Sequence, residues 1–170
     1  MGEHAHRDVL GRPVRVAIIT CSDTRTIDSD SAGAALAAMS AERGWAVVSH
    51  VVIPDDRATI SAAIIAQSDA DIPADLVLTC GGTGLSGRDV TPEATRDVAE
   101  RDVPGIAEHI RRESMAITRG RAQLSRGVAA QRNATLIVNL PGSEKAVRES
   151  FGFFADQVAH AVEMTAGGGH

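Results

Sequence analysis

Aromatic side chains are scarce in this chain of 170 residues, which contains one Trp, three Phe and no Tyr. The three phenylalanines all lie between positions 151 and 154. The chain is also acidic, with 17 basic against 22 acidic side chains and a formal net charge of −5. Proteins that bind single-stranded nucleic acid use aromatic platforms in a basic groove. We therefore exclude nucleic acid as a partner.

Cysteines and long apolar runs are also few. Cys21 and Cys80 are the two cysteines, too few for a disulfide scaffold. No stretch approaches the ~20 apolar residues of a membrane-spanning helix. The N-terminal residues MGEHAHRDVLGRP contain no apolar run of the kind found in signal peptides. We therefore expect a cytoplasmic protein that does not cross a membrane.

The length and the 44% hydrophobic content suit one compact domain. We expect a flexible arm at 1–13, a single domain at 14–164 and a disordered tail at 165–170. Apolar, β-branched runs predict strands at 14–20, 45–53, 75–79 and 135–139. Helical patterns predict helices at 31–43, 57–68, 91–102, 104–118 and 143–164.

The alternation of strands and helices predicts an α/β fold with a parallel sheet covered by helices on both sides. Residues 120–131 give no clear assignment and leave room for a short strand. Thr91-Pro92-Glu93 has the composition of a helix start, with Thr91 as the N-cap and Pro92 at the first helical position.

Four of the predicted strands end in polar or glycine-rich segments. In such a fold the chemistry gathers at the carboxyl ends of the strands. Glycine allows the backbone to approach a ligand closely, and a helix N-terminus offers free N–H groups to phosphate. The candidate phosphate-binding segments are Gly81–Gly84 and Pro141-Gly142-Ser143, beside polar ends at 20–23 and 54–56.

Carboxylates accompany these segments. Asp89 lies in the long glycine-rich loop, where it serves either as a local cap or as a metal-binding or acid/base group. Asp55 and Asp56 form either a solvated turn or a second functional carboxylate pair. Because glycine loops and carboxylates fall on the same sheet edge, we expect a phosphate reaction bridged by Mg²⁺.

Two strings identify a family. TCGGTGLSGRDVTPEAT (79–95) and NLPGSEKAV (139–147) closely resemble the molybdenum cofactor biosynthesis family MoaB/Mog. The resemblance implies a three-layer sandwich with a mostly parallel central sheet flanked by helices, and a homotrimer. It also implies that molybdopterin is bound and that its terminal phosphate attacks the α-phosphate of Mg-ATP. The adenylylated product would pass to a downstream molybdenum-insertion protein.

The resemblance also assigns roles to residues. In catalytic members, aspartates at the positions of Asp55 and Asp89 are essential, which implies that this pair binds Mg²⁺ and positions ATP. The family motif L-S-R matches Leu124–Arg126. The remaining matched or neighbouring positions are expected to bind pterin or phosphate: Ser22, Asp23, Gly81, Gly82, Thr83, Gly84, Arg88, Pro141, Gly142, Ser143 and Lys145.

Other readings stay open. The segment TCSDTRT is more similar to the MoaB branch, in which some members catalyse adenylylation, so a non-catalytic molybdopterin carrier or assembly protein is the alternative. The nucleotide-processing domain of competence-damage proteins is disfavoured by Arg88-Asp89-Val90-Thr91-Pro92. Ser31-Ala32-Gly33 departs from the consecutive Ser-Gly that is common in the family.

Three further features have both structural and functional readings. Cys21 and Cys80 are either small buried residues or thiols near the pterin dithiolene. Lys145, the only lysine, is either a surface residue or faces phosphate at a helix N-terminus, where a cation otherwise opposes the helix dipole. A third feature is a basic stretch. Its arginines either form a solvated face, pair across a subunit interface, or attract anionic ATP or pterin. The stretch comprises Arg111, Arg112, Arg119, Arg121 and Arg126.

Overall fold

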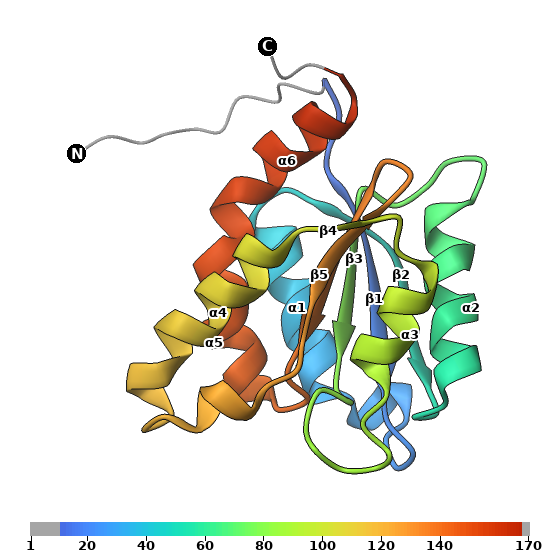
Figure 1. Cartoon of the computed structure of the whole chain (residues 1–170). Coiled ribbons are helices and arrows are strands. Elements are labelled where there is room, and N and C mark those ends of the chain that lie inside the picture. The colour runs from blue at the N-terminus through green and yellow to red at the C-terminus, as the bar shows by residue number, and fades with distance from the viewer. Residues whose placement is uncertain (1–10, 168–170) are drawn as a thin grey trace.

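The computed structural model describes residues 11–167 as a six-stranded sheet between two helical layers (Figure 1). The strand order is β2-β1-β3-β6-β5-β4. The first four strands in this order run parallel, and β5 is antiparallel to both β6 and β4. The expected three-layer, mostly parallel α/β fold is confirmed. The strands are β1 (Arg15–Cys21), β2 (Ala46–Ile53), β3 (Leu76–Cys80), β4 (Arg101–Asp102), β5 (Ala129–Arg132) and β6 (Thr135–Leu140).

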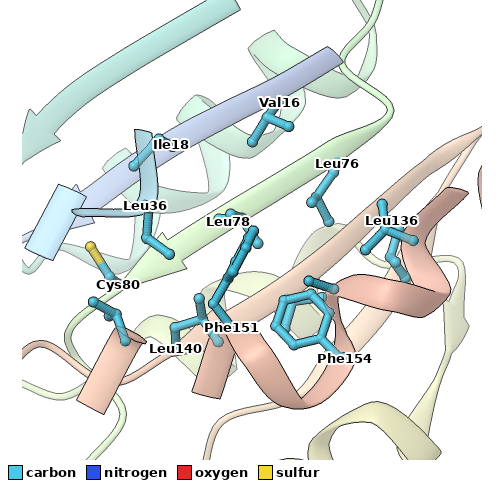
Figure 2. Close-up of a cluster of buried hydrophobic side chains, with 14 of the residues drawn as sticks. Val16, Ile18, Leu36, Leu76, Leu78, Cys80, Leu136, Leu140, Phe151 and Phe154 are labelled. Carbon is cyan, nitrogen blue, oxygen red and sulfur yellow. The ribbon is translucent and has the colours of Figure 1, made fainter. Parts of the chain in front are cut away.

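Successive residues of the central strands point into two separate cores, as strand geometry requires. One core lies under the larger helical layer and takes Val16, Ile18, Leu76, Leu78 and Phe151 (Figure 2). The other core takes the alternate strand residues and is covered by α2 and α3. The helices are α1 (Ser31–Glu42), α2 (Arg57–Ser68), α3 (Thr91–Val98), α4 (Pro104–Ile117), α5 (Glu144–Phe154) and α6 (Val158–Thr165), with short 3-10 turns η1 (Ile27–Ser29), η2 (Arg121–Leu124) and η3 (Ala155–Gln157).

The region around α3 corrects two expectations. Thr91 is not the N-cap of α3, because Val90 occupies that position and the Thr91 hydroxyl donates instead to the Gly81 carbonyl at 2.9 Å. The helix ends at Val98 and not at Asp102, because residues 101–102 leave it to pair with β5 as β4. The short strand allowed within 120–131 is β5.

The closing helix is also interrupted. The sequence predicts one helix over 143–164, whereas Ser143 caps α5 and Phe154, with φ of −124°, leaves helical geometry before η3. Apolar residues keep the same spacing in α5 and α6, with Phe151, Phe154, Val158 and Val162 all in one core. The periodicity therefore carries no signal of the break.

The ends of the chain are described in part. Of the arm expected at 1–13, residues 1–10 lie outside the described residues, and Arg12 pairs with Asp75 at 2.6 Å. Of the tail expected at 165–170, Thr165 ends α6, and residues 168–170 lie outside the described part. None of the helices within residues 11–167 combines the length and apolarity that crossing a bilayer requires.

Candidate functional site

The four parallel strands end at one edge of the sheet, at the bottom of Figure 1, and their loops meet there. Main-chain hydrogen bonds join the loops: Ser22 N–H donates to the Ile53 carbonyl at 2.9 Å, and Gly81 N–H donates to the Leu140 carbonyl at 3.1 Å. The predicted site segments that follow β1, β2, β3 and β6 thus lie together. We call this loop cluster the strand-end site.

The glycine loop after β3 needs glycine at its first two positions. Gly81 and Gly82 have φ of +99° and +66°, which side-chain-bearing residues rarely adopt. A Cβ at Gly81 would collide with the Cys21 carbonyl oxygen, and one at Gly82 would collide with the Thr91 hydroxyl. The loop is therefore packed closely against the end of β1 and the start of α3.

Asp89 closes the same loop onto itself. Its Oδ2 accepts a hydrogen bond from Ser86 N–H at 2.8 Å, so the local capping role exists. A Cβ at Gly84 would lie 2.9 Å from this oxygen, so Gly84 leaves the space that the carboxylate occupies. Thr83 is buried, and its carbonyl accepts from Arg126 N–H at 2.9 Å.

Asp55 has an unusual environment among the carboxylates of the site. Its N–H donates to Asp23 Oδ1 at 3.0 Å, and its Oδ2 accepts from Asp23 N–H at 3.2 Å. Its Oδ1 is buried and, within residues 11–167, has no hydrogen-bond partner. Burial, together with the charges of Asp23 and Asp89, raises the pKa of Asp55. Asp56, by contrast, caps α2 by accepting from Thr59 N–H at 2.8 Å.

Arg88 spans the site between two loops. Its guanidinium contacts Asp23 Oδ2 through Nη2 at 2.6 Å and Nε at 2.9 Å, and this hydrogen bonding lowers the pKa of Asp23. Both side chains are exposed, so the pair is open to exchange with a charged ligand.

The serines of the site already have structural partners. Ser22 Oγ accepts from Arg25 N–H at 3.1 Å, and Ser143 Oγ accepts from Ala146 N–H at 3.3 Å as the cap of α5. Gly142 packs against the glycine loop, because a Cβ on it would lie 3.2 Å from Gly81 Cα. Arg25 Nη1 donates to the Gly142 carbonyl at 2.6 Å and so ties the β1 loop to the β6 loop.

A cavity of about 240 Å³ opens beside this site, between α4, α5 and the end of β6. Its walls include Arg111, Ser125, Asn139, Pro141 and Glu149. Two hydrogen bonds fix the Asn139 side chain: its Nδ2 donates to the hydroxyls of Thr79 and Thr95, both at 2.9 Å. A larger cavity of about 510 Å³ is lined by residues such as Arg101, Leu136 and Met164, none of which belongs to the strand-end site.

The structure decides some of the open readings. Cys21 and Cys80 are free and buried in different cores, and burial raises their pKa values to about 12 and about 11, so the reading as small buried residues is confirmed. The arginines of the basic stretch have different environments. Arg112 is exposed, whereas the Arg126 side chain donates a hydrogen bond to the Gly84 carbonyl in the glycine loop. Lys145 is exposed in the first turn of α5, and its role toward phosphate stays a prediction.

The sequence does not predict the contacts that two arginines make in the site. Arg25 and Arg126 both donate to backbone carbonyls of other loops, at 2.6 Å to Gly142 and 2.7 Å to Gly84. A carbonyl acceptor leaves no mark in a residue pattern, so only the matched L-S-R motif pointed to Arg126. Within the described residues, no group of three or more His, Cys, Asp or Glu is arranged to hold a metal by itself.

Comparisons with known proteins agree with this geometry. Residues 17–160 match the family described as "Probable molybdopterin binding domain". Molybdenum cofactor biosynthesis protein B of Halalkalibacterium halodurans is 37% identical over 150 residues, 87% of each chain.

Solved structures give the same result. The structure of the molybdopterin biosynthesis enzyme MoaB from Thermus thermophilus is 40% identical, with a TM-score of 0.82, and covers 91% of this chain and 97% of its own. The Mog protein of Mycobacterium ulcerans is 37% identical, with a TM-score of 0.82, and covers 91% of this chain and 98% of its own. The chain therefore belongs to the molybdopterin-binding family of molybdenum cofactor biosynthesis proteins that includes MoaB and MogA.

Proposed function

We propose that this protein binds molybdopterin and adenylylates its terminal phosphate with Mg-ATP, releasing pyrophosphate. The observation that carries the proposal is the buried Asp55 Oδ1, which has no hydrogen-bond partner within residues 11–167 and faces the glycine loop. A buried polar atom without a partner is costly, and such atoms occur where a ligand or ion completes the site.

The residues of the site fit a magnesium ion. Mg²⁺ is usually bound by one or two carboxylates together with waters and substrate phosphates, which matches Asp55 and Asp89 on either side of the glycine loop. A cation there would favour the charged form of Asp55, whose pKa burial and neighbouring carboxylates raise. When bound, Mg²⁺ would neutralise negative charge on the ATP phosphates.

The chain's own residues would orient the two substrates for in-line transfer. The pterin would occupy the 240 Å³ cavity beside Asn139 and Pro141, with its phosphate directed toward the glycine loop. The Gly81 N–H is already bonded to the Leu140 carbonyl, so the N–H groups of residues 82–84 and of the N-terminus of α5 would bind phosphate oxygens. A pterin phosphate oxygen then forms a bond to the α-phosphorus of ATP, the bond from that phosphorus to the bridging oxygen breaks, and pyrophosphate leaves with the electron pair.

The alternative function is a non-catalytic molybdopterin carrier or assembly protein of the same family. Such a protein would need the cavity but not the carboxylates around the glycine loop. Asp55 favours the enzyme, because a carrier gains nothing from a buried carboxylate whose charged form is disfavoured.

A product assay tests the proposal. Purified protein is incubated with molybdopterin, ATP and Mg²⁺, and adenylylated pterin and pyrophosphate are quantified with and without EDTA. We expect equimolar products that require Mg²⁺. Pterin binding without any adenylylated product would refute the enzyme and leave the carrier.

We further propose, from the family resemblance, that the chain forms a homotrimer and delivers adenylylated molybdopterin to a molybdenum-insertion protein. Analytical ultracentrifugation should give a mass three times that of one chain. A monomer at the concentrations used for the product assay would contradict the trimer.

A further inference from the structure

The Arg126 side chain contacts the glycine loop at two carbonyls and also contacts the helix that follows the loop. It lies in the segment between η2 and β5, far from the loop in sequence. Its Nε donates to the Gly84 carbonyl at 2.7 Å, and its Nη2 donates to the Asp89 carbonyl at 2.5 Å. The same guanidinium pairs through Nη1 with Glu93, in the first turn of α3. One side chain thus contacts both ends of the 84–89 segment and the helix that follows it.

The segment between these two carbonyls has few other supports. Leu85 is 67% exposed, and residues 86–88 are exposed as well. Apart from Arg126, the group outside the loop that contacts this segment is Asp23, which forms an exposed ion pair with Arg88. The Asp89 carboxylate is held from within the segment, by Ser86 N–H at 2.8 Å. A main-chain hydrogen bond from Asp89 N–H to the Ser86 carbonyl at 3.0 Å closes the turn within the segment. The Arg126 guanidinium adds the contact from outside the loop that joins Gly84 to Asp89.

We propose that Arg126 is a positioning residue that fixes the Asp89 carboxylate in its working place by bridging the Gly84 and Asp89 carbonyls. The proposal rests on the proposed adenylyltransferase function and adds a residue to it. A planar guanidinium with donors in a fixed fork can join two carbonyls and a carboxylate at once, which the single ammonium of lysine cannot do in the same geometry. Catalytic rates are sensitive to such placement, since an error of about 1 Å can cost on the order of 100-fold.

The cavity wall does not depend on this side chain. Ser125 and Gly127 line the cavity on either side of Arg126. Ser125 N–H donates to the Ala122 carbonyl at 3.0 Å, and the Gly127 carbonyl accepts from Arg111 at 2.7 Å. Loss of the Arg126 side chain should therefore disturb Asp89 and spare pterin binding.

The test compares Arg126→Met and Arg126→Lys with Arg132→Met. Arg132 is a matched control, because its guanidinium also joins a carboxylate, Asp69, and a carbonyl, that of Val98, but away from the strand-end site. The first readout is hydrogen exchange of the peptide that contains the Ser86 amide. The second is the kcat of adenylylation and the Kd for molybdopterin.

We expect faster exchange around Ser86 in both Arg126 variants and not in Arg132→Met, with kcat lowered on the order of 100-fold at unchanged molybdopterin Kd. Wild-type behaviour of Arg126→Lys would overturn the proposal, because charge alone would then suffice, and so would unchanged exchange in Arg126→Met. If Arg126→Met does not fold, Arg126→Lys decides. If the wild type forms no adenylylated pterin, the proposed function fails, and the exchange measurement alone decides the role of Arg126.

Discussion

Asp55 combines burial of one carboxylate oxygen, the absence of a partner for it within residues 11–167, and two neighbouring negative charges. Each of these properties disfavours the charged form of the side chain, and together they raise its pKa. A folded-state pKa above the unfolded value means that the folded protein binds this proton more tightly. The charge of Asp55 therefore costs stability at neutral pH, and the cost disappears as the pH falls below about 4.

We expect Asp55→Asn to be at least as stable as the wild type at pH 7 while losing adenylylation. The gain in unfolding free energy should shrink as the pH falls through the raised folded-state pKa of Asp55, and it should be absent below about 4, where the wild-type carboxylate is protonated in both states. Chemical denaturation across pH measures it. Asp97→Asn is the control of opposite sign, because the Arg57 hydrogen bond lowers the pKa of Asp97. An Asp55→Asn protein less stable than the wild type at pH 7 would contradict the assignment.

Glycine is required at position 81 for two independent reasons, its φ of +99° and the collision of any Cβ with the Cys21 carbonyl. We expect Gly81→Ala to lower the unfolding free energy by about 1–3 kcal/mol and to impair turnover. Gly87→Ala lies in the same loop with nothing within 4 Å of an added Cβ, so we expect a change below about 0.5 kcal/mol. Urea unfolding of the two variants compares them, and equal stabilities would show that the loop relaxes freely.

Among the individual residues of the strand-end site, the sequence predicts the carboxylates and glycines but not the side chains that join the loops. Asp55 and Asp89 were predictable because they follow strand ends and match a motif. Arg25 and Arg126 act on main-chain carbonyls, whose positions are set by the folded loops and not by residue type. The unpartnered Asp55 oxygen is likewise a property of three-dimensional packing.

At the scale of elements, the start of α1 is joined to β1 and β2 by one buried carboxylate. Asp30 is 1% exposed and accepts from Gly33 N–H at 2.9 Å, from the Thr20 hydroxyl at 2.5 Å and, depending on tautomer, from His50 Nε2 at 2.8 Å. Gly33 has no room for a Cβ beside these groups. Although burial acts against it, this hydrogen bonding lowers the pKa of Asp30.

We expect Asp30→Ala to lower the unfolding free energy by on the order of 3 kcal/mol, because a helix cap is lost and buried donors are left without an acceptor. In the wild type this contribution is present above the unfolded pKa of about 3.9 and is lost as the pH falls through the lower folded value. Acid titration of stability checks this. Asp28→Ala, an exposed residue of η1, is the control, and an equally small effect in both variants would contradict the account.

Most element positions were predictable, and the exceptions have a common cause. The helix at 57–68 and the buried central strands follow from apolar periodicity alone. β4 has only two residues, Arg101 and Asp102, both exposed, and it exists because β5 lies beside it. The early end of α3 follows from the same pairing, which local sequence does not encode.

At the scale of the whole molecule, the parallel order β2-β1-β3-β6 brings four loops to one edge. The 240 Å³ cavity lies at the β6 end of this edge, where Pro141 lines it and the following Gly142 packs against Gly81 of the glycine loop. This arrangement separates binding from chemistry. In the proposed function, the cavity between α4 and α5 would hold the pterin, whereas Asp55 and Asp89 would act on the phosphates. A change confined to the carboxylates should therefore stop the reaction and leave the pterin bound.

The most direct test of this separation is the formation of adenylylated molybdopterin by the wild type and by Asp89→Asn, with molybdopterin Kd measured for both. We expect Mg²⁺-dependent product from the wild type, none from Asp89→Asn, and the same Kd for both proteins. Full turnover by Asp89→Asn, or a wild type that binds molybdopterin and ATP without forming product, would contradict this expectation.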